Sequence, residues 1–201
     1  MRLVVARKPL DQILRWTQRA LFAGGISLLA YCGFVLVDTW SFQKEERLRL
    51  QRLMQDQTSF SATPNMTLPA LNGDLIGSLD IPRLGLSAII MEGTDTVTLR
   101  RAVGHIAGTG IPGQSGNIGL AGHRDTFFLP LRNVRQSDII TLTTSAGEYR
   151  YRVVSTRIVN PNEVAVLDPN GSEILTLVTC YPFYFIGSAP DRFIVRAERV
   201  T

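Results

Sequence analysis

The sequence holds few of the residues that most often carry chemistry in enzymes. Its 201 residues include two Cys and two His. Cys32 lies in an apolar N-terminal run, so Cys180 is the single thiol of the polar part of the chain and has no partner there for a disulfide. The two His, Cys180 and Asp125 could together supply zinc ligands, but the paired C-x-x-C and H-x-x-x-H spacings of zinc sites are missing. We therefore expect no metal and no other cofactor.

An excess of positive charge is also missing from the main part of the chain. The net charge is +4, but residues 1–56 hold 9 Lys and Arg against 5 acidic residues, whereas residues 57–201 hold 12 of each. The chain lacks a basic helix, an aromatic-interleaved basic patch and zinc-finger spacing. The composition therefore does not predict nucleic acid as a partner.

Charged residues are absent from Leu21 to Val37, and Trp40 extends this apolar run. At ~1.5 Å per residue, about twenty residues cross the ~30 Å core of a bilayer, so we expect a transmembrane helix over residues 21–40. Lys and Arg outnumber Asp in residues 1–20, which predicts a cytoplasmic N-terminus and an extracytoplasmic main domain in a single-pass protein of the cell membrane. A cleaved signal peptide is disfavoured because residues 36–39 lack a small-x-small cleavage site.

Residues 41–73 are predicted to form a juxtamembrane stalk and linker. Ser41–Gln57 is charged, with apolar residues at helical spacing, and is either a stalk or a weak partner helix; the stalk is favoured. Thr58–Gly73 contains Ser, Thr, Asn, Pro and Gly without periodicity, which is typical of a flexible tether. The main domain is expected over residues 74–201.

Short runs of alternating or apolar residues recur through this domain. They predict strands over residues 75–81, 88–92, 118–121, 139–144, 148–159, 174–179 and 193–200. One or two helical turns are expected over Thr96–Val103, with Asp95 as the N-cap, and a hairpin turn over residues 145–147. Even spacing and little helix predict a mainly β fold, a small closed β-barrel of about seven or eight strands with short helices, after an N-terminal transmembrane helix.

Two predicted loops contain patterns that are associated with ligand binding. Gly108–Gly113 matches G-x-G-x-x-G, but that pattern binds dinucleotides only between a strand and a helix, and the turn-forming residues that follow it predict no helix. Nucleotide binding is therefore not predicted. The long loop Asn160–Gly171 is of the kind that tends to carry binding.

Cys180 follows a predicted strand, where a substrate can reach it. A nucleophilic thiol needs a base or a cation beside it, because the thiolate is the reactive form. The candidate bases are His105 and His123, and His123 ends a predicted strand as Cys180 does. From spacing alone the thiol and either His could be structural, and Arg192 is a surface residue at the start of a strand.

Three motifs and the N-terminal apolar run together resemble a known family. Leu120–Phe128 reads L-A-G-H-R-D-T-F-F, Thr176–Cys180 reads T-L-V-T-C, and Asp191–Val195 reads D-R-F-I-V. This combination resembles the sortases, which are membrane-anchored cysteine transpeptidases, over roughly residues 74–201. The residues around Cys180 and His123 are most similar to class D, with class E next.

The resemblance implies a role for each matching residue. Cys180 would be the nucleophile, His123 the general acid that protonates the leaving amine, and Arg192 the cation that holds the substrate and stabilises the oxyanion. Thr179 would make a secondary contact to substrate or oxyanion, and His105 would be structural or supporting. No departure from the family's three catalytic positions is visible.

The resemblance also implies a reaction and its partners. The thiolate would attack the Thr carbonyl of a Leu-Pro-x-Thr-x type signal at the C-terminal end of a protein substrate and leave a thioacyl enzyme. An amine from a cell-wall precursor or a pilin lysine would then form a new amide, for surface protein anchoring or pilus assembly. Calcium binds some sortases, but Glu163, Asp168 and Glu173 are too scattered to assign a site.

Two other functions compete with this one. An L,D-transpeptidase would need S-x-G-C-x-R, and Tyr181 and Pro182 occupy the positions after Cys180 instead. A membrane-held β-barrel that scaffolds pilus or wall assembly, with an inert Cys180, is the non-enzymatic alternative.

Overall fold

The computed structural model describes residues 7–59, 73–169 and 171–200. The chain forms two compact units, residues 1–41 and residues 42–201. The first unit consists of the N-terminal part of helix α1 (Arg7–Ser59), and α1 is long and apolar enough to cross a membrane. The predicted span over residues 21–40 lies within this helix. Most of the tether predicted over Thr58–Gly73 falls on residues 60–72, which lie outside the described residues.

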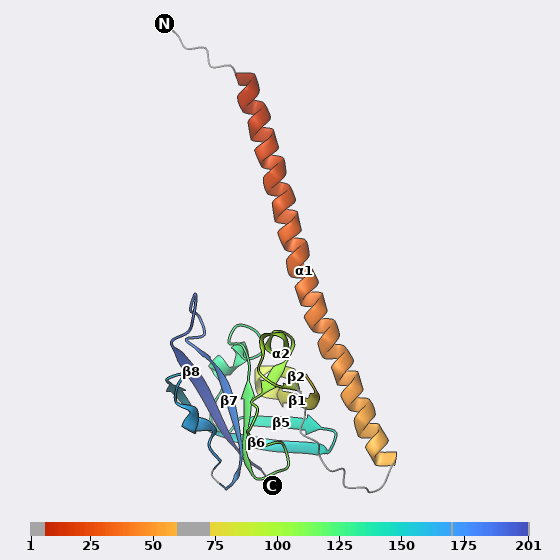
Figure 1. The fold of residues 1–201 in the computed structure, drawn as a ribbon, viewed down its shortest axis with the longest axis vertical. Coiled ribbons are helices and arrows are strands. Elements are labelled where there is room, and N and C mark those ends of the chain that lie inside the picture. Colours follow the sequence, from red (N-terminus) through yellow and green to blue (C-terminus); the bar gives the residue numbers. More distant parts are fainter. Residues whose placement is uncertain (1–6, 60–72, 170, 201) are drawn as a thin grey trace. The chain divides into compact units, whose positions relative to one another are not determined.

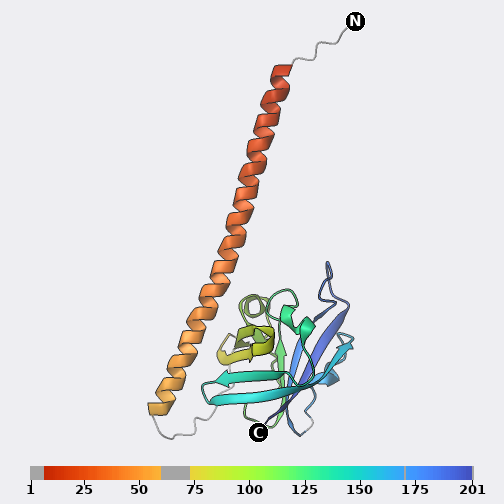
Figure 2. The ribbon, with the colours of Figure 1, turned by 180° about the vertical axis from the view of Figure 1, so that it is seen from behind.

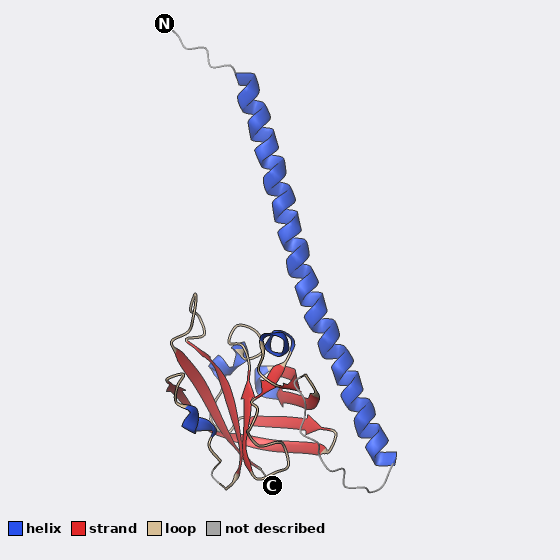
Figure 3. Ribbon diagram, in the orientation of Figure 1, coloured by secondary structure: helices blue, strands red, loops and turns tan. Residues whose placement is uncertain are grey.

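The second unit is built on a closed barrel of eight strands in the order β1-β2-β3-β4-β7-β8-β6-β5, which confirms the predicted fold class (Figures 1 and 3). The strands are β1 (Leu75–Ile81), β2 (Leu86–Glu92), β3 (Val103–His105), β4 (Gly116–Ala121), β5 (Ile139–Thr144), β6 (Gly147–Val159), β7 (Glu173–Tyr181) and β8 (Asp191–Arg199). The helices are α2 (Thr96–Arg101) and the 3-10 turns η1 (Pro82–Leu84), η2 (Leu129–Asn133) and η3 (Val164–Leu167).

The barrel closes because alternate residues of its strands are apolar and point inward. Along β5, buried and half-buried residues alternate, and Ile140 and Leu142 enter the core. The long β5–β6 hairpin, seen from the other side in Figure 2, adds the fully buried Tyr151. Leu175 and Leu177 of β7 also point inward. The residues that alternate with them along β7, Thr176, Val178 and Cys180, therefore belong to the outer face of the strand.

The structure differs from the predicted elements mainly around β3. Asp95 caps α2 as predicted, because its side chain accepts hydrogen bonds from the backbone N–H groups of Val97 and Thr98. The helix ends at Arg101, however, and Val103 begins a three-residue strand that pairs in parallel with β2. The glycine run at residues 108–113 leads into the strand β4 rather than a helix, so the dinucleotide motif is not formed.

The part of α1 that belongs to the second unit is attached to β2 and α2 by a side-chain amide. Gln43 Nε2 donates to the carbonyl oxygen of Arg101 at 2.6 Å, and Gln43 Oε1 accepts from the backbone N–H of Ile89 at 2.9 Å. Phe42 packs on an apolar cluster that contains Ile89, and Leu50 is buried. These contacts favour the partner-helix alternative for residues 42–50.

Candidate active site

Three neighbouring strands bring the predicted site residues to one edge of the barrel. β4 and β7 run parallel, with Ala121 opposite Val178. His123 comes two residues after Ala121 and Cys180 two residues after Val178, so both lie at the same edge of the barrel. β7 and β8 run antiparallel, with Cys180 directly opposite Arg192. Residues opposite each other in an antiparallel pair share a face and lie about 4.5–5.5 Å apart at Cα. The thiol and the guanidinium therefore belong to the same outer face.

Cys180 is a free, half-buried thiol that lies within β7. Arg192 likewise lies within β8, and its Nη1 donates to the carbonyl oxygens of Asp191 at 3.0 Å and Ala189 at 3.4 Å. Each residue lies one position from the end of its strand, close to where the sequence predicted it, and both are paired in the ladder, which fixes their backbones.

The segment that carries His123 is bound to β7 just before Cys180. The backbone N–H of Gly122 donates to the carbonyl oxygen of Val178 at 3.2 Å, and Thr179 Oγ1 donates to the carbonyl oxygen of Gly122 at 2.7 Å. Thr179 is only 2% exposed, so its hydroxyl acts inside the protein. The substrate contact expected for Thr179 stays a prediction. In the structure its hydroxyl group holds the backbone carbonyl of Gly122, the residue before His123.

Gly122 is required by a close contact rather than by its backbone angles. A Cβ at this position would lie 2.8 Å from the ring of Phe128, which is fully buried in the core. The glycine therefore lets the chain leave β4 against the Phe128 ring and turn so that His123 is exposed.

A small pocket lies on the same outer face as Cys180. It has a volume of about 120 Å³, and β7 and β8 contribute Thr176, Ile194 and Arg196 to it. Side chains two and four positions apart in a strand point the same way, so Thr176 and Cys180 share a face. The 160–171 loop closes the pocket with Glu163, Ala165 and Val166.

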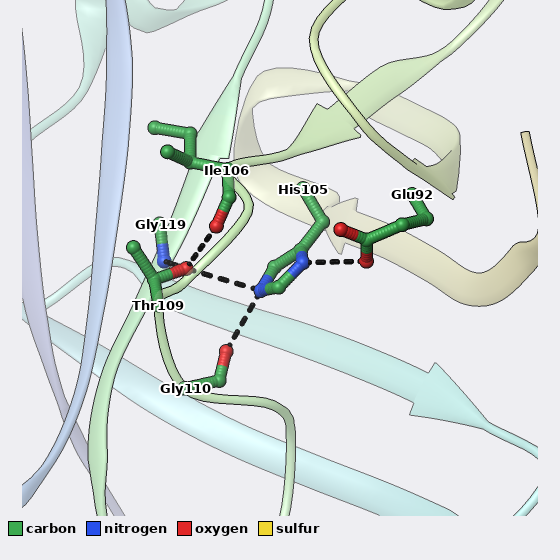
Figure 4. A network of polar contacts seen from close by, with 6 residues as sticks. All are labelled: Glu92, His105, Ile106, Thr109, Gly110 and Gly119. Carbon is green, nitrogen blue, oxygen red and sulfur yellow. Dashed lines mark hydrogen bonds and ion pairs between the residues drawn. The ribbon is translucent and has the colours of Figure 1, made fainter. Parts of the chain in front are cut away.

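His105 lies in a different, buried network (Figure 4). Its Nδ1 lies 2.7 Å from Glu92 Oε2, and its Nε2 lies 2.8 Å from the carbonyl oxygen of Gly110 and 3.0 Å from Thr109 Oγ1. A carbonyl oxygen only accepts, so Nε2 carries a proton. His105 is therefore held by structural partners, in agreement with the supporting role implied for it.

A zinc site built from both His is not formed. Within the described ranges 7–59, 73–169 and 171–200, no group of three or more His, Cys, Asp and Glu side chains could hold a metal ion. The side chains near Cys180 are instead suited to acyl transfer, because they combine a thiol, an imidazole and a fixed cation.

One further residue at this edge of the barrel was not predicted from the sequence. Arg124, directly after His123, donates three hydrogen bonds to carbonyl groups of residues 182–190, the loop between Cys180 and Arg192. An Arg next to a His carries no sequence signal for such contacts, because the carbonyl groups that it binds belong to the backbone.

The chain is similar to known proteins in both sequence and fold. The sortase domain family matches residues 79–200. Sortase D of Bacillus subtilis (strain 168) is 35% identical over 191 residues, which cover 90% of this chain and 96% of that protein. The solved structure of a Clostridium perfringens Sortase D5 transpeptidase superposes with a TM-score of 0.67 at 25% identity, covering 80% of this chain and 99% of that chain.

A second solved structure, sortase C-1 from Actinomyces oris, superposes with a TM-score of 0.58 at 32% identity over 62% of this chain and 73% of that chain. The predicted resemblance, closest in kind to class D, is thereby confirmed. The chain belongs to the sortase family of cysteine transpeptidases.

Proposed function

We propose that this sortase cleaves a Leu-Pro-x-Thr-x type sorting signal after Thr and transfers the acyl group to an amine. The proposal is supported mainly by the pairing of the strands. Arg192 lies opposite Cys180, and β4, which pairs with β7, ends two residues before His123. A thiol, a proton donor and a cation on one edge are the groups that acyl transfer through a thioester requires.

In the first half of the reaction Cys180 and His123 act in turn. The Cys180 thiolate attacks the Thr carbonyl carbon, and the carbonyl oxygen takes the negative charge. Arg192 lies on the same face and stabilises this oxyanion through its N–H donors. When the C–N bond breaks, His123 gives its proton to the leaving amine, and the acyl group stays on sulfur as a thioester.

In the second half an amine replaces the leaving group. Its nitrogen attacks the thioester carbon, the C–S bond breaks, and the proton lost by the amine returns to His123. A new amide and the original thiolate result. The amine of a cell-wall precursor would give surface anchoring, whereas a pilin lysine would give pilus assembly.

The signal is proposed to lie along the outer face of β7. The pocket lined by Thr176, Ile194 and Val166 follows from Cys180 along this face and offers both apolar and polar surface. Since the 160–171 loop covers it, we propose that this loop helps to choose the substrate. Exchanging the loop for one from a sortase of different preference should then move that preference.

The apolar part of α1 is proposed to anchor the enzyme in the cell membrane. Lys and Arg near its start favour a cytoplasmic N-terminus, with residues 74–201 outside. Substrates held in the same membrane would meet the enzyme at a raised effective concentration.

The test is an incubation of the full chain in detergent with a library of Leu-Pro-x-Thr-x peptides and an amine acceptor, read by mass spectrometry. We expect cleavage after Thr with formation of the new amide. Cys180→Ala should abolish both products, while Cys32→Ala, which removes the other thiol, should keep them. Cleavage that persists in Cys180→Ala, or a folded enzyme that processes no peptide and whose Cys180 resists alkylation, would contradict the proposal.

A further inference from the structure

The loop of residues 182–190 joins the strand that carries Cys180 to the strand that carries Arg192 (Figure 1). Its central residues Tyr184, Phe185 and Ile186 are exposed, Ile186 completely. Apolar burial therefore contributes little to fixing the centre of this loop. Phe183, near the start of the loop, packs against the core, but the centre of the loop is held by polar contacts.

Arg124 supplies most of these contacts from the segment that carries His123. Its Nη1 donates to the carbonyl oxygen of Pro182 at 2.9 Å, and its Nη2 donates to those of Phe185 at 2.8 Å and Gly187 at 3.0 Å. The guanidinium carbon also lies 5.8 Å from the centre of the Phe185 ring. A guanidinium presents several N–H donors in one rigid plane, so it can bind carbonyl groups that one ammonium group cannot reach together.

Arg192 binds the other end of the same loop. It donates to the carbonyl oxygens of Ala189 and Asp191. To stabilise an oxyanion on the substrate, this guanidinium has to exchange part of these contacts for the reacting group. A loop held by Arg192 alone would lose its support during the reaction.

We propose that Arg124 is a positioning residue for the transpeptidation. It holds residues 182–190 from the His123 side, so that the loop keeps its place when the Arg192 side chain leaves Ala189 and turns to the substrate. The inference rests on the proposed function, because it concerns the same reaction. Arg124 acts through Arg192 and the loop backbone, and contacts neither the substrate nor the reacting atoms.

A second arginine, from η2, contacts the same loop and provides a matched control. Arg132 lies over the ring of Tyr184 at 5.3 Å and donates to its hydroxyl group. These contacts involve a side chain at the exposed tip and leave the backbone carbonyl groups to Arg124. Arg132→Ala therefore removes an arginine that contacts the loop without removing the support of the loop backbone.

The test compares steady-state kinetics of Arg124→Ala, Arg124→Lys and Arg132→Ala in the full chain, using the peptide and acceptor that the wild type accepts. We expect kcat to fall about 10- to 100-fold in Arg124→Ala, because small displacements of a catalytic group are costly, with KM within about twofold. Arg124→Lys, which binds fewer carbonyl groups, should be intermediate, and Arg132→Ala should stay within about twofold of the wild type.

A double-mutant cycle with Arg192→Lys separates positioning from a general structural role. If Arg124 acts through Arg192, the kcat loss from Arg124→Ala should shrink in the Arg192→Lys background. A wild-type kcat in folded Arg124→Ala, an equal loss in Arg132→Ala, or losses that simply add would overturn the proposal. If Arg124→Ala fails to fold, Arg124→Lys takes its place in the cycle.

Amide hydrogen exchange keeps this inference separate from the proposed function. Amide exchange at residues 183–189 should be at least about tenfold faster in Arg124→Ala than in Arg132→Ala, because the loop backbone has lost its hydrogen bonds to Arg124. Unchanged exchange overturns the inference even if the wild type is active. A wild type that cleaves no signal peptide refutes the proposed function, and with it the catalytic part of the inference.

Discussion

At the scale of single residues, the most demanding contact is the buried pair of Glu92 and His105. These side chains come from the ends of β2 and β3 and are 7% and 3% exposed. Thr109 extends the network: its Oγ1 accepts from the backbone N–H of Gly119 and donates to the carbonyl oxygen of Ile106 (Figure 4). The pair therefore ties β2 and β3 to the loop that leads into β4, the strand that ends before His123.

Breaking this pair should cost much more than breaking a surface pair. We expect Glu92→Gln to lower the free energy of unfolding by about 1–3 kcal/mol, because it replaces the carboxylate in a buried hydrogen bond to the His105 ring. The matched control is Glu163→Gln, which breaks the exposed ion pair with Arg157 and should cost under about 0.5 kcal/mol. Urea unfolding followed by circular dichroism measures the free energy of unfolding of both variants. Equal losses of stability would show that the buried pair stabilises the fold no more than the exposed one.

The sequence identified single residues only where their chemistry is rare. Cys180 and two candidate bases, His105 and His123, stood out because the chain has so few thiols and imidazoles, and the family resemblance then favoured His123. Arg192 is one of many arginines, and only the family resemblance distinguished it. Arg124 could not be found in this way, since its partners are carbonyl groups of a loop whose path depends on how β7 and β8 pair.

At the scale of elements, an ion pair joins two turns at one end of the barrel. Arg83 of η1 binds the carboxylate of Asp138, which follows η2 and also accepts from the backbone N–H of Arg135 at 2.8 Å. Asp138 is 6% exposed at its side chain, while Arg83 is 41% exposed. The hydrogen bond from Arg83, more than any other contact, lowers the pKa of Asp138 below its ordinary value, and burial acts against this.

This lowered pKa predicts how stability depends on pH. A carboxyl group with a lower pKa in the folded state stabilises the fold above its unfolded pKa of about 3.9, and the contribution is lost as the pH falls through the folded value. Asp138→Asn should lower the free energy of unfolding by about 1–2 kcal/mol at pH 7 and by much less at pH 2–3. The loss at pH 7 is modest because Arg83 is half exposed to solvent, which weakens the pair. Unfolding in urea across pH 2–7 tests this; parallel curves for the two proteins would contradict it.

The elements themselves were predicted unevenly, for a physical reason. Hairpin β5–β6 follows from local alternation around Gly147, and its strands match the predicted ranges closely. β3 was not predicted because three residues are too few to show the alternation of apolar and polar residues typical of a strand. It is a strand because it pairs in parallel with β2. The pairing of Cys180 with Arg192 likewise depends on a barrel order that brings β4, β7 and β8 together, which no local pattern contains.

At the scale of the whole molecule, the boundary of the catalytic unit matters for any soluble form of the enzyme. Residues 42–201 form one compact unit, and Gln43, Phe42 and Leu50 all belong to it. A fragment that starts at residue 58, where the predicted tether begins, would lose these contacts. The soluble form to compare with the full chain therefore begins at Phe42.

That comparison tests why the enzyme would carry an apolar helix at all. A helix that crosses the membrane confines the enzyme to the surface where its proposed substrates are held, which raises their effective concentration without any new contact. In vesicles, the full chain should therefore process a lipid-anchored signal peptide at least about 10²-fold faster than residues 42–201 at equal bulk concentration. On a free peptide the two forms should have kcat/KM values within about twofold, because the site lies entirely in the second unit. Equal rates on the lipid-anchored peptide would show that the helix does not act as a tether, whereas a loss on the free peptide would show that residues 1–41 contribute to the site itself.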